Sequence, residues 1–141
     1  MRVIDFHTHF FPGEIAKKTV DYLSEKGMAK AYGEGALDSL KEYMEKDGVD
    51  ISVNAPIATR PEQVKSINRK MIEYNSSVKN IICLGTMHPH FGSEKEAEEE
   101  IAFLAASGIK GIKMHTEYQS FYPDDGTLGR IYRACEKNNV F

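Results

Sequence analysis

Short apolar runs alternate with longer amphipathic stretches along all 141 residues of the chain. Short apolar runs are typical of buried strands, whereas apolar positions that recur every three or four residues are typical of helices. The pattern predicts strands over residues 2–6, 50–56, 80–87 and 110–114. It predicts helices over residues 12–26, 37–46, 61–75, 94–107 and 127–138. Strands that alternate with helices in this order predict an α/β fold of right-handed βαβ units with a parallel sheet.

The helix predicted over residues 94–107 has a clear start signal and a run of acids. Ser93 and Glu96 form a capping-box pattern, and Gly108 follows the last helical residue. Acidic side chains in the early turns interact favourably with the helix dipole. We therefore expect the glutamates of this helix to lie on a solvated face that indicates no partner: Glu94, Glu96, Glu98, Glu99 and Glu100.

Composition and charge narrow the class of protein. With 41% hydrophobic residues and a formal net charge of −3, residues 1–141 are expected to form one soluble domain with a real core. The chain has no long basic stretch, which disfavours nucleic-acid binding. No apolar run approaches the roughly twenty residues of a membrane span, and the chain opens with a strand rather than a signal peptide. We therefore expect a cytoplasmic protein without membrane contact, with Cys83 and Cys135 as core residues.

A His-Thr-His motif directly follows the first predicted strand. Because alternate side chains of a strand point to the same face, His7 and His9 should share a face with Val3 and Asp5. Neutral imidazole is a common ligand of zinc, and two imidazoles on one short element lose little entropy on binding. The spacing therefore predicts that His7 and His9 form half of a metal site. Two solvated loop histidines remain the alternative interpretation.

The fourth predicted strand carries a second set of candidates. If the apolar Ile112 and Met114 pack on the helices, Lys113 and His115 project from the opposite, inward face. A buried lysine is costly unless it is paired or neutralised, so an inward Lys113 requires a specific role. His115 is compatible with both a site residue and a solvated loop residue.

Two stretches at the ends of predicted strands form a pattern together. They are IDFHTHFFP at residues 4–12 and GIKGIKMH at residues 108–115, and the second is followed by Gln119, Phe121 and Pro123-Asp124-Asp125. Together they resemble the amidohydrolase superfamily, in particular the amidohydrolase-related, decarboxylase-like branch of TIM-barrel metal-dependent hydrolases. The resemblance implies a parallel (β/α) barrel of TIM type. With about four βα units, this chain would be the N-terminal half-barrel.

The resemblance implies metal-dependent hydrolysis of a small carboxylate- or amide-bearing molecule. His7 and His9 would hold a divalent metal, most plausibly zinc, that activates a water molecule while a carboxylate takes its proton. In the family the general base and further metal ligands come from strands five, six and eight, beyond the four strands predicted here. Nonoxidative decarboxylation on the same scaffold is the alternative, and a noncatalytic half-barrel or truncation product is another.

The resemblance also implies roles for the other candidates. A strand-four lysine is carboxylated and bridges two metals in some members, and Lys113 could instead orient a substrate carboxylate or pair with Asp5. His115 is a possible metal or substrate ligand. His88, which ends the third strand, and Gln119, in the loop after the fourth, are expected to contact substrate, because barrel active sites lie on the loops that follow the strands. The alternative for His88 is a proline-fixed turn.

A half-barrel has consequences for assembly. Its first and fourth strands would be exposed edges, and exposed edges favour pairing with another chain. We therefore expect either a homo-oligomer or complementation by the missing barrel half. A phosphoesterase of the polymerase-and-histidinol-phosphatase type also opens with a strand-borne His-x-His, but Phe10-Phe11-Pro12 stands here in place of its Ser-Asp-Gly continuation.

Overall fold

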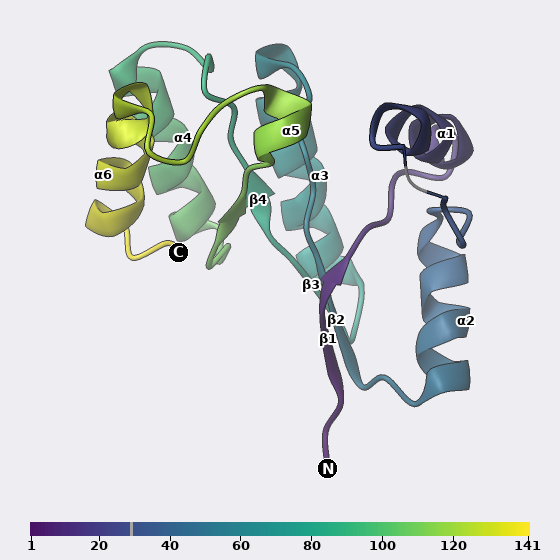
Figure 1. Ribbon diagram of the computed structural model, residues 1–141. Coiled ribbons are helices and arrows are strands. Elements are labelled where there is room, and N and C mark those ends of the chain that lie inside the picture. The colour runs from purple at the N-terminus through teal and green to yellow at the C-terminus, as the bar shows by residue number, and fades with distance from the viewer. Residues whose placement is uncertain (29) are drawn as a thin grey trace. The chain divides into compact units, whose positions relative to one another are not determined.

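The computed structural model describes residues 1–28 and 30–141, and helices follow parallel strands in it as the alternating pattern predicts (Figure 1). The α/β class and the parallel pairing are thereby confirmed. The chain divides into two compact units, residues 1–54 with 80–82 and residues 55–79 with 83–141. The expectation of one domain over the whole chain stays a prediction.

The first unit is built on the parallel pair β1 (Ile4–Thr8) and β2 (Ile51–Asn54), with β3 (Ile81–Cys83) next in the sheet. Helices α1 (Ala16–Lys26) and α2 (Leu37–Asp47) connect the two paired strands. Helix α2 ends at Gly48, whose left-handed φ of 69° costs a glycine little. This connection returns the chain to the start of β2, parallel to β1.

Strand β1 is exposed along most of its length. Thr8 is its one buried residue, while the side chains of Ile4 and Phe6 are 53% and 63% exposed. The register shifts by one residue between Asp5 and Thr8, because three steps along β1 match two steps along β2. Such a bulge interrupts the strict alternation of faces that the sequence pattern assumes.

The second unit carries the larger core. Its helices are α3 (Val64–Ser77), α4 (Glu94–Ala106), α5 (Thr116–Gln119) and α6 (Gly129–Lys137), and its strands are β4 (Gly85–Thr86) and β5 (Ile112–Lys113). Short 3-10 turns, η1 (Pro61–Gln63) and η2 (Gly126–Leu128), precede α3 and α6. The fully buried members of this core include Val64, Met87, Ile101, Leu128 and Ile131. As expected, Cys83 and Cys135 are buried.

The third predicted strand is divided. Residues 80–87 form β3 and β4, which belong to different sheets. Helix α3 occupies hydrogen-bonding positions along this segment, since the Asn75 carboxamide accepts from the N–H of Cys83 (2.7 Å) and donates to its carbonyl (3.0 Å). Asn68 does the same at Thr86, at 2.8 and 3.1 Å. A carboxamide can both donate and accept, as a peptide group does, so these two side chains satisfy strand backbone.

The last residue already pairs with β5. The N–H of Phe141 donates to the carbonyl of Lys110 (3.0 Å), and the N–H of Ile112 donates to the carbonyl of Phe141 (2.8 Å). This is the hydrogen-bond pattern of a parallel neighbour. Gly111 permits the close approach, because a Cβ there would lie 2.6 Å from the Phe141 ring.

The expectation of a solvated glutamate face is wrong for Glu100. This side chain is 2% exposed, and its carboxylate accepts two bonds from the Arg69 guanidinium (2.8 and 3.0 Å) and one from Asn68 (2.9 Å). Glu100 lies three residues after Ala97 and four before Leu104, so it shares the buried face of α4 with them. The acidic run hid this position, because composition alone does not separate the two faces.

Candidate functional site

His7 and His9 lie close together at the end of β1. Their ring centroids are 4.9 Å apart with an interplanar angle of 65°. Two imidazoles bound to one tetrahedral zinc through bonds of about 2 Å have centroids roughly 5 Å apart, so this pair fits the spacing of two ligands. Both residues are exposed. The two rings therefore lie close together despite the bulge, and a face shared with Val3 and Asp5 stays a prediction.

Backbone anchors flank this histidine pair. The Thr8 hydroxyl donates to the carbonyl of Val53 (3.0 Å), and the N–H of Phe10 donates to Oδ1 of Asn54 (2.9 Å). The peptide on each side of His9 is thus fixed to β2. Within residues 1–28 and 30–141, no three His, Cys, Asp or Glu side chains gather as a metal site. Two imidazoles are a suitable donor set for a divalent metal, but they supply half of the usual ligands.

His88 follows β4 and is 5% exposed. Its Nδ1 accepts a hydrogen bond from the backbone N–H of His90 (3.1 Å). Burial lowers the pKa of His88 below its ordinary value, the positive charge of His90 lowers this pKa further, and Glu62 acts in the opposite direction. His88 is consequently held as a neutral imidazole, while His90 is exposed.

The side chain of Gln119 is 4% exposed and bonds to three backbone groups. Its Nε2 donates to the carbonyls of Ala58 and Met87, both at 2.7 Å, and its Oε1 accepts from the N–H of His115 at 2.7 Å. One carboxamide therefore joins three loops that follow β2, β4 and β5. The predicted contact of Gln119 with substrate stays a prediction, and both of its amide hydrogens are used within the protein.

Ile112 and Met114 pack against the core of the second unit, as the alternation in the fourth predicted strand requires. The placement of Lys113 and His115 on the inward face stays a prediction. His115 caps the start of α5, with its Nδ1 accepting from the N–H of Tyr118 (3.4 Å) and its ring 4.3 Å from the Tyr118 ring. The roles of Lys113 and His115 toward metal or substrate stay predictions.

Thr86 was not predicted as a site residue from the sequence. This fully buried threonine accepts from the N–H of Ala58 (3.2 Å) through its hydroxyl and donates to the carbonyl of Lys113 (2.9 Å). It thus joins the same strand ends as Gln119, from within β4. A polar residue two positions before His88 at a strand end was the available signal.

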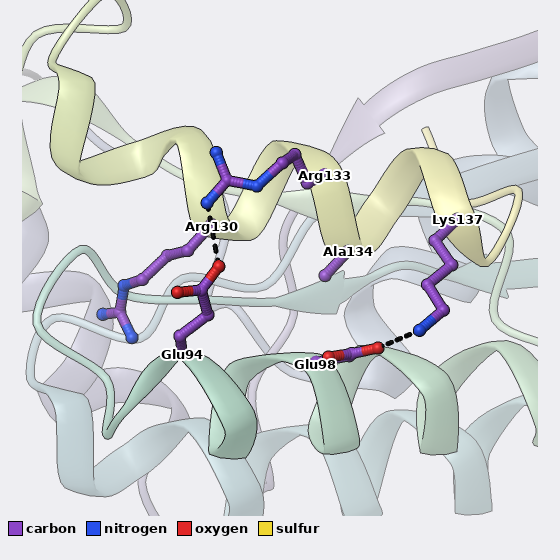
Figure 2. A pocket seen from close by; sticks show the side chains of 6 residues that line it. All are labelled: Glu94, Glu98, Arg130, Arg133, Ala134 and Lys137. Atoms are coloured by element: carbon purple, nitrogen blue, oxygen red, sulfur yellow. Dashed lines mark hydrogen bonds and ion pairs between the residues drawn. The ribbon is translucent and has the colours of Figure 1, made fainter.

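A groove of about 190 Å³ lies between α4 and α6, and none of the residues that line it is a predicted site residue (Figure 2). Its charged side chains are paired with one another: Arg133 donates to Glu94 at 2.8 Å, and Lys137 pairs with Glu98. Arg130 donates to the carbonyls of Gly92 and Pro89. These interactions join the two helices and the loop before α4.

Comparisons with known proteins identify solved structures that share this fold. No family model and no curated protein match the chain. Among solved structures, an uncharacterised TIM-barrel protein from Bordetella bronchiseptica is 15% identical, with a TM-score of 0.70, over 99% of this chain and 53% of its own. A 5-carboxyvanillate decarboxylase from Novosphingobium aromaticivorans, complexed with manganese, is 18% identical (TM-score 0.68; 99% and 48% covered). A putative amidohydrolase from Staphylococcus aureus is 19% identical (TM-score 0.67; 99% and 46% covered).

These likenesses show that the chain shares the α/β fold of TIM-barrel proteins, in agreement with the resemblance. The chain spans about half the length of the solved structures it matches, and the half-barrel itself stays a prediction. A complete barrel is not formed by the described residues. None of the described helices is both long and apolar enough to cross a membrane.

Proposed function

We propose, from the fold that this chain shares with amidohydrolase-related barrels, that it forms part of a metal-dependent hydrolase. The substrate would be a small carboxylate- or amide-bearing molecule, and a metal-activated water would attack it. The observation that carries this proposal is the His7 and His9 pair, whose ring centroids lie 4.9 Å apart on an anchored strand end. Barrel enzymes place their reacting groups at such strand ends.

His7 and His9 would hold the metal through imidazole nitrogens. The bound ion would polarise the substrate and lower the pKa of its water. We propose zinc as the first candidate, and manganese is a second, since the Novosphingobium decarboxylase contains it. Further ligands and the general base would come from outside the strands described here. In the second unit, we propose that Lys113 and His115 contact metal or substrate and that His88 and Gln119 contact substrate.

Nonoxidative decarboxylation is supported equally well. One of the matched structures is a decarboxylase and another is described as a putative amidohydrolase, at almost the same identity. The two reactions share the metal and differ in whether a water molecule or a proton reaches the substrate carbon. Release of carbon dioxide from a carboxylated aromatic substrate would separate them.

Metal binding by the histidine pair is the first test. We would measure zinc and manganese per chain by equilibrium dialysis, for the parent and for the double variant His7→Ala/His9→Ala. Loss of an imidazole ligand should weaken binding by tenfold or more, given that even outer-shell changes cost about 10–100-fold. His90→Ala is the matched control, because His90 is also exposed but follows another strand. Equal affinity of the double variant and the parent would exclude this site.

We further propose that other βα units complete the barrel, supplied by the missing half or by a second copy. The exposed Ile4 and Phe6 of β1 support this, as does the parallel pairing of Phe141 with β5. Sedimentation of the parent chain should show association that Ile4→Ser/Phe6→Ser reduces. A strictly monomeric parent at high concentration would count against a second copy.

A further inference from the structure

His88 has a defined tautomer. A backbone N–H donates to its Nδ1, so this nitrogen carries a lone pair and no proton. In the neutral ring, which burial favours here, the proton must then reside on Nε2. An Nε2 that carries a proton has no lone pair to offer a metal ion. His88 is therefore a hydrogen-bond donor rather than a metal ligand.

The backbone around His88 is fixed on both sides. Before it, the carbonyl of Met87 accepts from Gln119. After it, the N–H of Phe91 donates to the carbonyl of His88 (2.9 Å), which closes a turn, and Arg130 donates to the carbonyl of Pro89 (2.8 Å). The imidazole thus stands on a rigid frame, as is expected of a group that binds a ligand in one geometry.

Nε2 of His88 is reachable from solvent. Over residues 1–28 and 30–141 no hydrogen bond from this atom is present, and the one buried side-chain nitrogen or oxygen without a partner is Oγ of Ser52. Nε2 therefore retains accessible surface although the ring as a whole is buried. The Nε2–H of His88 can therefore donate a hydrogen bond to an acceptor on a bound ligand.

We propose that His88 donates from Nε2 to a carboxylate oxygen of the substrate, and that Gln119 is the positioning residue that holds it there. The identity of the ligand as a substrate rests on the proposed function. A carboxylate is the fitting acceptor, because hydrogen bonds to ionised oxygens are the stronger ones and a neutral donor does not compete for the metal. Glu62 and His90 are the charged neighbours that act on the ring.

Two substitutions of His88 separate its two nitrogens. In His88→Asn the side-chain oxygen can still accept from the N–H of His90, as in a common Asx turn, but the distal donor is lost. In His88→Gln a longer amide restores a donor near the position of Nε2. We therefore expect His88→Asn to fold like the parent yet bind a carboxylate less well, and His88→Gln to recover part of the binding.

The probe is sodium benzoate, titrated against the metal-free chain and followed by imidazole ¹⁵N resonances. Benzoate should shift the Nε2 resonance of His88 in the parent, and His88→Asn should bind it about 10–100-fold more weakly, as loss of a bond to a charged group predicts. The parent spectrum should show the Nε2–H tautomer. An Nδ1–H tautomer, absence of benzoate binding, or equal binding by His88→Asn would each overturn the proposal.

Gln119 is tested against an equivalent amide elsewhere. Gln119→Glu keeps the acceptor for His115 but loses the donors to two carbonyls, so it should move the His88 resonances and weaken benzoate binding. Asn75→Asp loses a comparable bond to backbone without contact to the loops around His88. If both variants leave the His88 resonances unchanged, Gln119 does not position this ring.

Manganese binding distinguishes this proposal from the proposed function. His88→Asn should bind manganese as the parent does, and a loss would show that His88 is a ligand and overturn the proposal. If the parent binds benzoate at His88 but no metal at His7 and His9, the metal-dependent function fails while the donor role of His88 stands.

Discussion

The chain carries histidines at the ends of two kinds of strand. His7 and His9 follow β1, an exposed and bulged strand, and both rings are exposed. His88 follows β4, whose two residues are buried; its ring accepts one hydrogen bond from the N–H of His90, and Gln119 bonds to the carbonyl of the preceding Met87. Exposed imidazoles can bind a metal and further ligands. In a buried imidazole whose Nδ1 already accepts a hydrogen bond, only Nε2 can interact with a ligand, as a hydrogen-bond donor.

In our proposals, the two strand ends have different tasks, metal binding at His7 and His9 and substrate binding at His88. Metal ligands must stay deprotonated and accessible, and their geometry is completed by the ion itself. A substrate donor has no ion to order it, so the protein must fix it beforehand. The hydrogen bonds of Gln119 and Thr86 lie at the second kind of strand end, in agreement with this division.

Gln119→Leu should have the largest effect on stability, because it removes the bonds that distinguish the fixed strand end. The buried carbonyls of Ala58 and Met87 would lose their hydrogen-bond donor at about 1–3 kcal/mol each, and the half-buried N–H of His115 would lose its acceptor, so the free energy of unfolding should fall by several kcal/mol. Urea denaturation measures it. Gln63→Leu is the control, since the half-buried Gln63 carboxamide bonds near the surface and water can replace it. A loss below about 1 kcal/mol for Gln119→Leu would contradict this interpretation.

Glu100→Ala tests the support behind β4. The carboxylate holds Asn68, which bonds to Thr86, and it pairs with the half-exposed Arg69. Because Arg69 can return to water, we expect a loss of about 2 kcal/mol rather than the larger cost of a stranded buried charge. Glu99→Ala, which removes an exposed pair with Lys95, should change stability by less than about 0.5 kcal/mol. If Glu100→Ala and Glu99→Ala lower the melting temperature equally, the burial of Glu100 does not contribute to stability.

Phe6→Ser should have little effect on the folded chain, because the Phe6 side chain is 63% exposed. We expect the free energy of unfolding to change by less than about 1 kcal/mol, whereas Phe91→Ser, in the core of the second unit, should cost about 3–5 kcal/mol. Chemical denaturation of the two variants side by side makes the comparison. A large loss for Phe6→Ser would show that β1 is already covered.

The smallest expected effect concerns pH. The unfolded chain protonates His88 near its ordinary pKa of 6.5, whereas burial lowers this pKa in the folded chain. The unfolded state therefore binds more protons as the pH falls through 6.5, and stability decreases. Between about pH 7.5 and about pH 5.5 the parent should lose more stability than His88→Asn, which has no imidazole at this position. If the urea midpoints of the parent and of His88→Asn change equally with pH, His88 is not held in its neutral form in the folded chain.

Hydrophobic periodicity predicted the order of helices and strands, because the pattern within each element depends only on which of its own side chains are buried. It could not predict the division of residues 80–87, since a continuous apolar run does not reveal which neighbour each half pairs with. Helix α5 was also missed, because four residues leave no period and His115 is an unusual cap. The misreading of Glu100 arose from composition.

In the candidate site, sequence spacing predicted only those side chains that are neighbours along the chain. His7 and His9 lie two residues apart, so strand geometry alone brought them together. Gln119 bonds to Ala58 across 61 positions of sequence and to Met87 across 32, and no single-sequence pattern encodes such pairs. The tautomer of His88 likewise depends on a turn whose geometry only the structure provides.

The spacing of the two asparagines of α3 matches the spacing of their partners in the neighbouring strand segment. Asn68 and Asn75 are seven residues apart, a rise of about 10.5 Å in two helical turns. Their partners, Thr86 and Cys83, are three strand residues apart, which is about 10 Å. Because these lengths agree, a single inserted residue within either interval would rotate one carboxamide by about 100° or displace its partner. Natural variants of this segment should therefore keep its length and the two asparagines.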